Sequence, residues 1–158
     1  MTTLNLDVNR TIEVALFLTT KTAELNHSWL AEICYQADRL SLTMYGRVIT
    51  GATYSIRAGK IASDDLLSLV DECQSVTESD GVISGLREVD EDELSGSDID
   101  CLNTVVSIFL LSMADKEDGI LDYSDTYPKV EEDRLISLEE LASTVDNIAE
   151  LRKHLFLK

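Results

Sequence analysis

Few side chains in this sequence could carry out catalysis or hold a metal ion. The chain has two histidines, His27 and His154, and three cysteines, Cys34, Cys73 and Cys101. Neither histidine has a cysteine or a carboxylate at metal-binding spacing, and the cysteines are far apart. Thirty Asp and Glu residues always offer carboxylate pairs, so a pair alone does not indicate a hydrolase. We predict no catalytic residue, no cofactor and no metal, and a protein that is not an enzyme.

Two acidic segments resemble cation sites only superficially. Residues 90–93 are four consecutive carboxylates, but adjacent side chains on an extended chain point to opposite sides. Residues 115–122 resemble a calcium loop, which needs glycine at its sixth position and oxygen ligands at the first and third. Placing Gly119 sixth puts Ala114 first and Lys116 third. We therefore interpret both segments as acidic loops.

The sequence predicts a cytoplasmic protein that does not contact a membrane. Each cysteine falls in an apolar helical pattern, as expected for buried thiols in a reducing compartment. No stretch reaches the roughly 18 apolar residues of a membrane span. The N-terminal residues lack the basic leader of a signal peptide.

Charge is unevenly distributed along the chain. The net charge is −17; residues 1–60 carry six Lys or Arg and five Asp or Glu, whereas residues 61–158 carry seven and 25. The second part would repel nucleic acid, so we expect no direct nucleic-acid binding. It could attract a basic protein surface or compete with DNA for one. The alternative is that the acidity only maintains solubility.

A small basic and aromatic patch follows the second predicted helix. It contains Tyr45, Arg47, Tyr54, Arg57 and Lys60. Such a patch indicates either a protein contact or ordinary edge residues. The predicted partner interface combines this patch with carboxylates that follow it in the chain. These are Asp64, Asp65, Asp90, Glu91, Asp92 and Glu93.

Apolar spacing and capping residues predict the elements that position these side chains. The fold class is mainly α, a compact bundle of about five helices with a small β-hairpin. Short strands are expected within residues 48–56 and 82–89. The helices cover about residues 9–25, 28–44, 64–75, 96–113 and 138–155. The expected caps are Asp7 or Asn9, Asn26 or Ser28, Ser63, Ser95 with Asp98, and Ser137 with Glu140.

The order of elements in the first half resembles a winged helix in outline. The third helix would then enter a DNA groove, but it carries Asp64, Asp65, Asp71 and Glu72 and no basic residue. This predicts a module that does not use that outline to bind DNA.

Burial is predicted from the same helical spacing. Leu67 on the third helix and Leu110 on the fourth are expected to face inward. Asp38 and Arg39 are expected on the polar side of the second helix as a solvated ion pair, and His27 is expected at the surface.

Residues 29–61 carry the one family resemblance in the chain. They hold Tyr35, Asp38 and Arg39, then a Gly-Arg-x-Ile-Thr-Gly turn at residues 46–51, then Tyr54, then a glycine element at residues 59–61. A second motif of the same resemblance is Leu-Ser-x-x-Asp-Ile at residues 94–99. These motifs resemble the Panacea antitoxin domain family, which includes phage-associated SocA-like and GepA-like proteins. Lys60 replaces the family's proline, and the family's His and Trp after the long helix are absent.

The resemblance implies a single Panacea-like domain over residues 1–158. Residues 6–113 form the family-like core, and residues 114–158 form a divergent acidic loop and C-terminal helix. It implies an antitoxin-like protein of mobile elements that neutralises a partner protein by direct binding. Charge suggests the alternative of a phage or prophage inhibitor that mimics DNA and blocks a nucleic-acid-binding defence protein, such as a CRISPR or restriction component. A homodimer is compatible with both interpretations.

Overall fold

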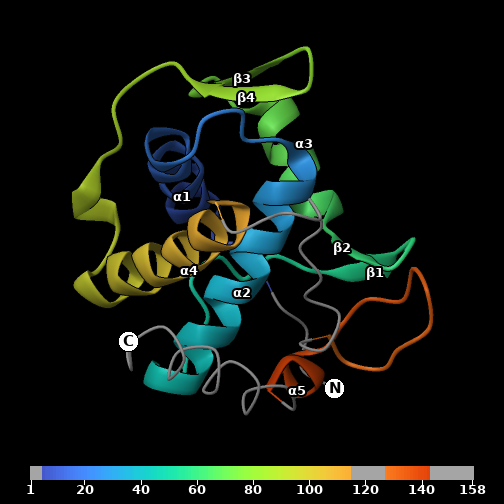
Figure 1. The fold of residues 1–158 in the computed structure, drawn as a ribbon. Helices are drawn as coiled ribbons and strands as arrows, with labels where there is room; N and C mark the ends of the chain where they lie inside the picture. Colours follow the sequence, from blue (N-terminus) through green and yellow to red (C-terminus); the bar gives the residue numbers. More distant parts are fainter. Residues whose placement is uncertain (1–4, 115–126, 143–158) are drawn as a thin grey trace.

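The computed structural model describes residues 5–114 and 127–142 of the chain. These residues form five α-helices, one short 3₁₀ helix (Glu91–Glu93) and two antiparallel hairpins (Figure 1). The mainly helical fold is confirmed, with two hairpins where one was predicted. The helices are α1 (Val8–Lys21), α2 (His27–Tyr45), α3 (Asp64–Glu72), α4 (Gly96–Ala114) and α5 (Leu138–Ala142). The strands are β1 (Ser55–Arg57), β2 (Lys60–Ala62), β3 (Val76–Ser79) and β4 (Val82–Gly85).

Helix α2 forms the centre of the fold. Figure 1 shows it between α4 on one side and the β1–β2 hairpin on the other, and it contacts both. Residues 33–41 are all buried, so this helix has no solvent-facing side along that length. The prediction that Asp38 and Arg39 form a solvated ion pair is therefore wrong, because both side chains are 0% exposed. Polar side chains on an enclosed helix must find partners inside the protein.

Single side-chain caps begin three of the helices, as their sequence positions predict. Asp7 accepts a hydrogen bond from the backbone N–H of Arg10 at 3.2 Å, and Asn26 accepts one from Trp29 at 2.8 Å. Ser63 caps α3. These acceptors satisfy backbone donors that have no partner within the helix. The structure selects Asp7 over Asn9 and Asn26 over Ser28.

Reciprocal capping boxes begin α4 and α5, which confirms both predictions. The backbone N–H of Ser95 donates to Asp98 at 3.0 Å, and that of Asp98 donates to the Ser95 hydroxyl at 3.0 Å. The same exchange joins Ser137 and Glu140 at 3.0 and 3.2 Å. Each box pairs two donors that would otherwise lack partners.

Both hairpins turn through two-residue loops. Ala58 and Gly59 join β1 to β2, and Asp80 and Gly81 join β3 to β4, all four with positive φ. Such loops match the right-handed twist of the flanking strands, and Asp-Gly is among their preferred sequences. The helix predicted over about residues 64–75 is shorter, because α3 ends at Glu72 and Val76 begins β3. The Asp-Gly pair was the signal for this hairpin.

A close backbone contact fixes the segment that follows α2. Gly46 ends that helix in the left-handed conformation, where the predicted turn at residues 46–51 begins. Gly51 has φ of +71°, and a Cβ atom there would lie 2.0 Å from the carbonyl oxygen of Asn5. Only glycine allows the two chain segments to approach this closely.

Two leucines expected in the core lie at the surface. Leu67 on α3 is 42% exposed and Leu110 on α4 is 45% exposed. The buried side of α3 instead consists of Leu66, Leu69 and Val70. That spacing of i, i+3 and i+4 covers one face of a short helix, and Leu67 falls outside it.

Several predictions lie outside the described residues. They concern the rejected calcium loop at residues 115–122 and the part of the last helix beyond Ala142. The predicted division of the chain into a core and a divergent C-terminal part stays a prediction.

Candidate protein-binding site

The side chain of Asp38 anchors the turn that follows α2. Its Oδ1 accepts hydrogen bonds from the backbone N–H groups of Ile49 at 2.7 Å and Thr50 at 2.9 Å. Its Oδ2 accepts from the hydroxyls of Thr50 and Tyr54, both at 2.6 Å. Burial raises the pKa of Asp38, and these hydrogen bonds oppose that rise. Asp38, Thr50 and Tyr54 thus have a structural role at the centre of the fold.

Tyr54 is therefore removed from the predicted partner interface. Its side chain is 0% exposed, and its ring packs edge-on against Tyr35 with centroids 5.3 Å apart. The sequence predicts Tyr54 at the surface as part of a small basic and aromatic patch. Hydrogen bonding to Asp38 turns Tyr54 inward instead.

Arg39 is also held inside the protein. Its guanidinium donates to Gln36 at 2.8 Å and lies 5.7 Å from the centroid of the Tyr35 ring. Burial lowers the pKa of Arg39 to about 10, so the side chain stays charged at neutral pH. It contributes an internal charge and is no part of a surface patch.

The remaining basic and aromatic residues do not form one patch. Tyr45, 42% exposed, and Arg47 lie where α2 ends, and the Arg47 guanidinium donates to Ser95 at 2.9 Å and Ser97 at 3.0 Å. Arg47 is also 3.4 Å from the buried carboxylate of Asp98. These contacts hold Arg47 against the first turn of α4, apart from the hairpin that carries Arg57 and Lys60.

Arg57 and Lys60 are exposed on the β1–β2 hairpin. The Arg57 side chain bonds Asp133 at 2.8 Å and lies 3.4 Å from Asp64. These neighbours hold the pKa of Arg57 above its usual value. Two carboxylates around one guanidinium leave Arg57 little net positive charge to offer a partner.

Of the two aspartates that begin α3, Asp64 is exposed and Asp65 is partly buried. Asp65 accepts hydrogen bonds from the Thr53 backbone N–H at 2.9 Å and the Thr53 hydroxyl at 2.8 Å. Asp65 therefore fixes the chain between α2 and β1, and its share in any partner contact is smaller than the sequence predicts.

Exposed carboxylates follow the chain from α3 to the start of α4. Figure 1 shows this part of the backbone running over the β3–β4 hairpin at the top and then down to α4. Residues 61–110 contain 13 Asp or Glu and a single Lys or Arg, which is Arg87. Eleven of these carboxylate residues are exposed. Asp64 pairs with Arg57 and Glu78 with His27, and the other nine form what we call the acidic strip. They are Asp71, Glu72, Asp80, Glu88, Asp90, Glu91, Asp92, Glu93 and Asp100.

The one arginine in this part of the chain is bound to a carboxylate of α1. Arg87 donates two hydrogen bonds to Glu13, at 2.6 and 3.0 Å, and the Glu13 side chain is 5% exposed. The hydrogen bond from Arg87 lowers the pKa of Glu13, so the pair is fully ionised at neutral pH. Arg87 therefore leaves the acidic strip without a counter-charge of its own.

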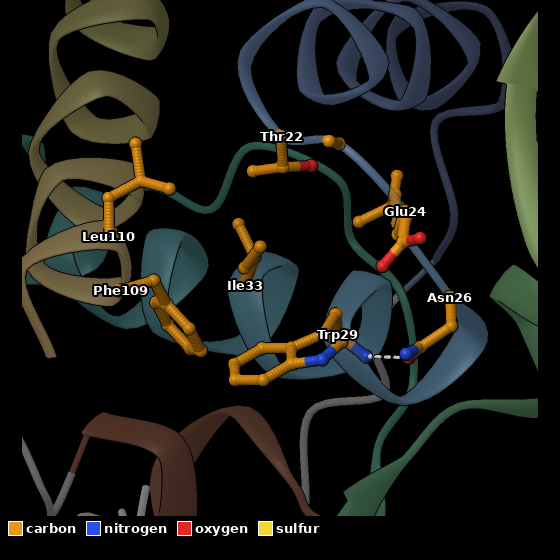
Figure 2. A pocket seen from close by; sticks show the side chains of 9 residues that line it. Thr22, Glu24, Asn26, Trp29, Ile33, Phe109 and Leu110 are labelled. Atoms are coloured by element: carbon orange, nitrogen blue, oxygen red, sulfur yellow. Dashed lines mark hydrogen bonds between the residues drawn. The ribbon is translucent and has the colours of Figure 1, made fainter. Parts of the chain in front are cut away.

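An apolar pocket opens between α2, α4 and the link of residues 22–26 that joins α1 to α2 (Figure 2). Trp29 and Ile33 come from α2 and Phe109 and Leu110 from α4. The rings of Trp29 and Phe109 meet edge to face, with centroids 5.1 Å apart and planes at 78°. The pocket encloses about 150 Å³, and we call it the Trp29 pocket. Its other described lining residues are Thr22, Ala23, Glu24, Leu25 and Asn26.

The sequence interpretation did not single out this pocket. Trp29 is the only tryptophan of the chain and stands in the first turn of α2, four residues before Ile33. A large aromatic side chain at the end of a helix, next to an exposed link, was the available signal. Helical spacing predicts Leu110 in the core, because its position fits the apolar face of α4.

The described residues contain no group of three or more His, Cys, Asp or Glu side chains arranged to hold a metal ion. None of the helices within residues 5–114 and 127–142 is long and apolar enough to cross a membrane. His27 is partly exposed and pairs with Glu78 on β3. The arrangement of the described residues thus offers surfaces and small pockets.

Comparisons with family models, with curated proteins and with solved structures find no match for this chain. The proposals below therefore depend on the contacts, burial and charge of the residues themselves.

Proposed function

We propose that this protein is a non-catalytic binding module that neutralises a partner protein by direct contact. The observation that carries the proposal is the acidic strip, in which nine exposed carboxylates have no basic residue of residues 61–110 free to pair with them. Fixed charge of one sign attracts a surface of the opposite sign and repels nucleic acid. The partner surface is therefore rich in Lys and Arg.

An antitoxin-like role is the first form of this proposal. Of the motif residues that resemble the Panacea family, Ile49, Thr50 and Tyr54 hydrogen-bond to Asp38 and fix the path of the chain between α2 and β1. This supports a structural role for the motif, while other surfaces make the contact. The partner is then a toxin whose basic surface is covered.

A nucleic-acid mimic is the alternative, and the charge distribution favours it. If the winged-helix outline holds, α3 is the helix that would face DNA. It exposes Asp64, Asp71 and Glu72 and has no Lys or Arg. Such a helix resembles a phosphate-bearing surface and would compete with DNA for a basic groove. The partner is then a nucleic-acid-binding defence protein.

The acidic strip is tested by capturing the partner with the full-length chain from a lysate of the cells that naturally make it. The double variant Glu91→Gln, Glu93→Gln should retain less of the captured protein than wild type. A matched double variant, Glu131→Gln with Glu139→Gln, removes the same charge from a different surface and should retain as much as wild type. Equal retention by both variants would overturn the role of the strip.

The salt dependence of binding affinity distinguishes the antitoxin form of the proposal from the nucleic-acid mimic. Affinity for the captured partner is measured by calorimetry at about 50 and 300 mM NaCl, where the Debye length falls from roughly 14 to 6 Å. A mimic of DNA should lose most of its affinity, and duplex DNA should displace it. An antitoxin with a packed apolar interface should lose little and should not be displaced.

A further inference from the structure

The Trp29 pocket combines an apolar interior with an exposed rim. Ile33 and Phe109 form its walls, and Leu110 is 45% exposed beside it. Figure 2 shows Leu110 and Phe109 on α4 facing Trp29 and Ile33 on α2 across the opening. Large apolar and aromatic groups around a small depression are the usual receptor for an anchoring side chain at a protein interface.

The size of the Trp29 pocket sets the size of its occupant. Its volume is about 150 Å³. Drug-sized ligands use pockets of roughly 300–1,000 Å³, whereas an apolar cavity of about 150 Å³ accommodates one benzene ring. The space therefore fits one large side chain, such as Phe, Leu or Met, and is too small for a cofactor.

The rim of the pocket carries negative charge. Glu24 is exposed and lines the opening beside Asn26 (Figure 2). No Lys, Arg or His is among the nine described lining residues, and no ion pair within the described part of the chain involves Glu24. A carboxylate at the edge of an apolar pocket favours an occupant with a cation next to its apolar side chain.

We propose that the Trp29 pocket receives one large apolar side chain from a basic segment of a partner protein, with Glu24 pairing with the adjacent Lys or Arg. This rests on the proposed function and deepens it. The acidic strip attracts a basic partner at long range, and the pocket supplies the short-range apolar anchor. An interface with a buried aromatic anchor and a charged periphery binds more tightly than charge alone permits.

The single tryptophan allows a direct test on the full-length chain. Excitation at about 295 nm reports Trp29 without contribution from the five tyrosines. The probe is the peptide acetyl-Lys-Lys-Phe-Lys-Lys-amide, which carries the proposed anchor between cations. We expect it to change the Trp29 emission and to protect Trp29 from quenching by acrylamide. The same peptide with alanine in place of phenylalanine should have no such effect.

Single-residue variants test whether the peptide binds in the Trp29 pocket. Leu110→Lys adds a long charged side chain at the opening and should raise the dissociation constant at least about fivefold. Leu86→Lys is the matched control, because Leu86 is 60% exposed and lies outside the pocket; it should bind as wild type does. Glu24→Gln keeps the shape and removes the charge, and should weaken binding about threefold. Circular dichroism checks that each variant is folded.

Three results would overturn the proposal. Equal binding by Leu110→Lys and Leu86→Lys would place the peptide elsewhere. An equal change in Trp29 emission with the alanine peptide would show that the peptide binds by charge attraction alone, without an apolar anchor. Trp29 shielded from acrylamide in the free protein would show that the chain itself fills the pocket. Each result can occur while the double variant Glu91→Gln, Glu93→Gln still loses its partner, so failure here is distinguishable from failure of the proposed function.

Discussion

Asp38 shows how one buried carboxylate organises a connecting segment. Four donors from three residues converge on its two oxygens, and all lie 11 to 16 residues away in the chain. The side chain would otherwise be an isolated buried charge, which is strongly unfavourable. Hydrogen bonding thus stabilises both the carboxylate and the turn after α2.

Replacing Tyr54 by phenylalanine should destabilise the protein. Tyr54→Phe removes a 2.6 Å hydrogen bond to a buried carboxylate and keeps the ring that packs against Tyr35. The expected loss in the free energy of unfolding is about 1–3 kcal/mol. Urea denaturation measures it. Tyr45→Phe is the matched control at an exposed position, and its stability should equal that of wild type. Equal stability of both variants would contradict the structural role assigned to Asp38.

At the scale of elements, connections between segments decide the path of the chain. The backbone N–H of Asp7 donates to Thr50 at 2.8 Å, and that of Ile136 donates to Tyr54 at 2.7 Å. These bonds bring the start of α1 and the residues before α5 against the same segment that Asp38 holds. The segment between α2 and β1 is therefore a junction of three parts of the chain.

Gly51 provides the element-scale test. Gly51→Ala places a methyl group 2.0 Å from the Asn5 carbonyl oxygen at a φ of +71°. We expect a loss of more than about 2 kcal/mol in the free energy of unfolding, because both the contact and the backbone angle oppose alanine. Gly96→Ala is the control. A Cβ added there would meet no atom within 4 Å beyond its chain neighbours and its own helix backbone, and the residue begins α4. Thermal unfolding should show a lower midpoint for Gly51→Ala alone.

At the scale of the whole molecule, net charge determines which other molecules the protein attracts or repels. A charge of −17 on 158 residues repels itself and resists association with nucleic acid. Residues 1–60 carry six Lys or Arg, of which Arg39, Arg47 and Arg57 already contact other side chains, whereas residues 61–110 carry a single one. The surface from α3 to α4 is therefore the most negative part that the structure describes.

This self-repulsion should make the protein more stable in moderate salt. Raising NaCl from about 20 to 200 mM screens interactions between exposed charges. We expect the unfolding midpoint to rise by a few °C, roughly what 1 kcal/mol gives in a chain of this length. The double variant Glu91→Gln, Glu93→Gln should show a smaller rise than wild type. A midpoint that falls with salt would mean that attractive ion pairs dominate.

The sequence alone determined the local features of the fold. Ser63, Ser95 and Ser137 could be identified as caps, and Asp7 and Asn26 as one of two candidates each. A cap needs only a short side chain and a helix that begins beside it. The end of α2 at Gly46 and the mainly helical class follow from equally local rules. The net charge and its concentration after residue 60 are also properties of the sequence itself.

Tertiary structure decided which side chains reach the surface. Asp38, Arg39 and Tyr54 are polar or amphipathic, and their spacing cannot show that α2 is enclosed on every side. Leu110 fits an apolar face, yet it is exposed beside the Trp29 pocket because α4 packs on α2 through other residues. Periodicity reports the faces of one helix, whereas burial depends on which faces are covered by elements distant in the chain.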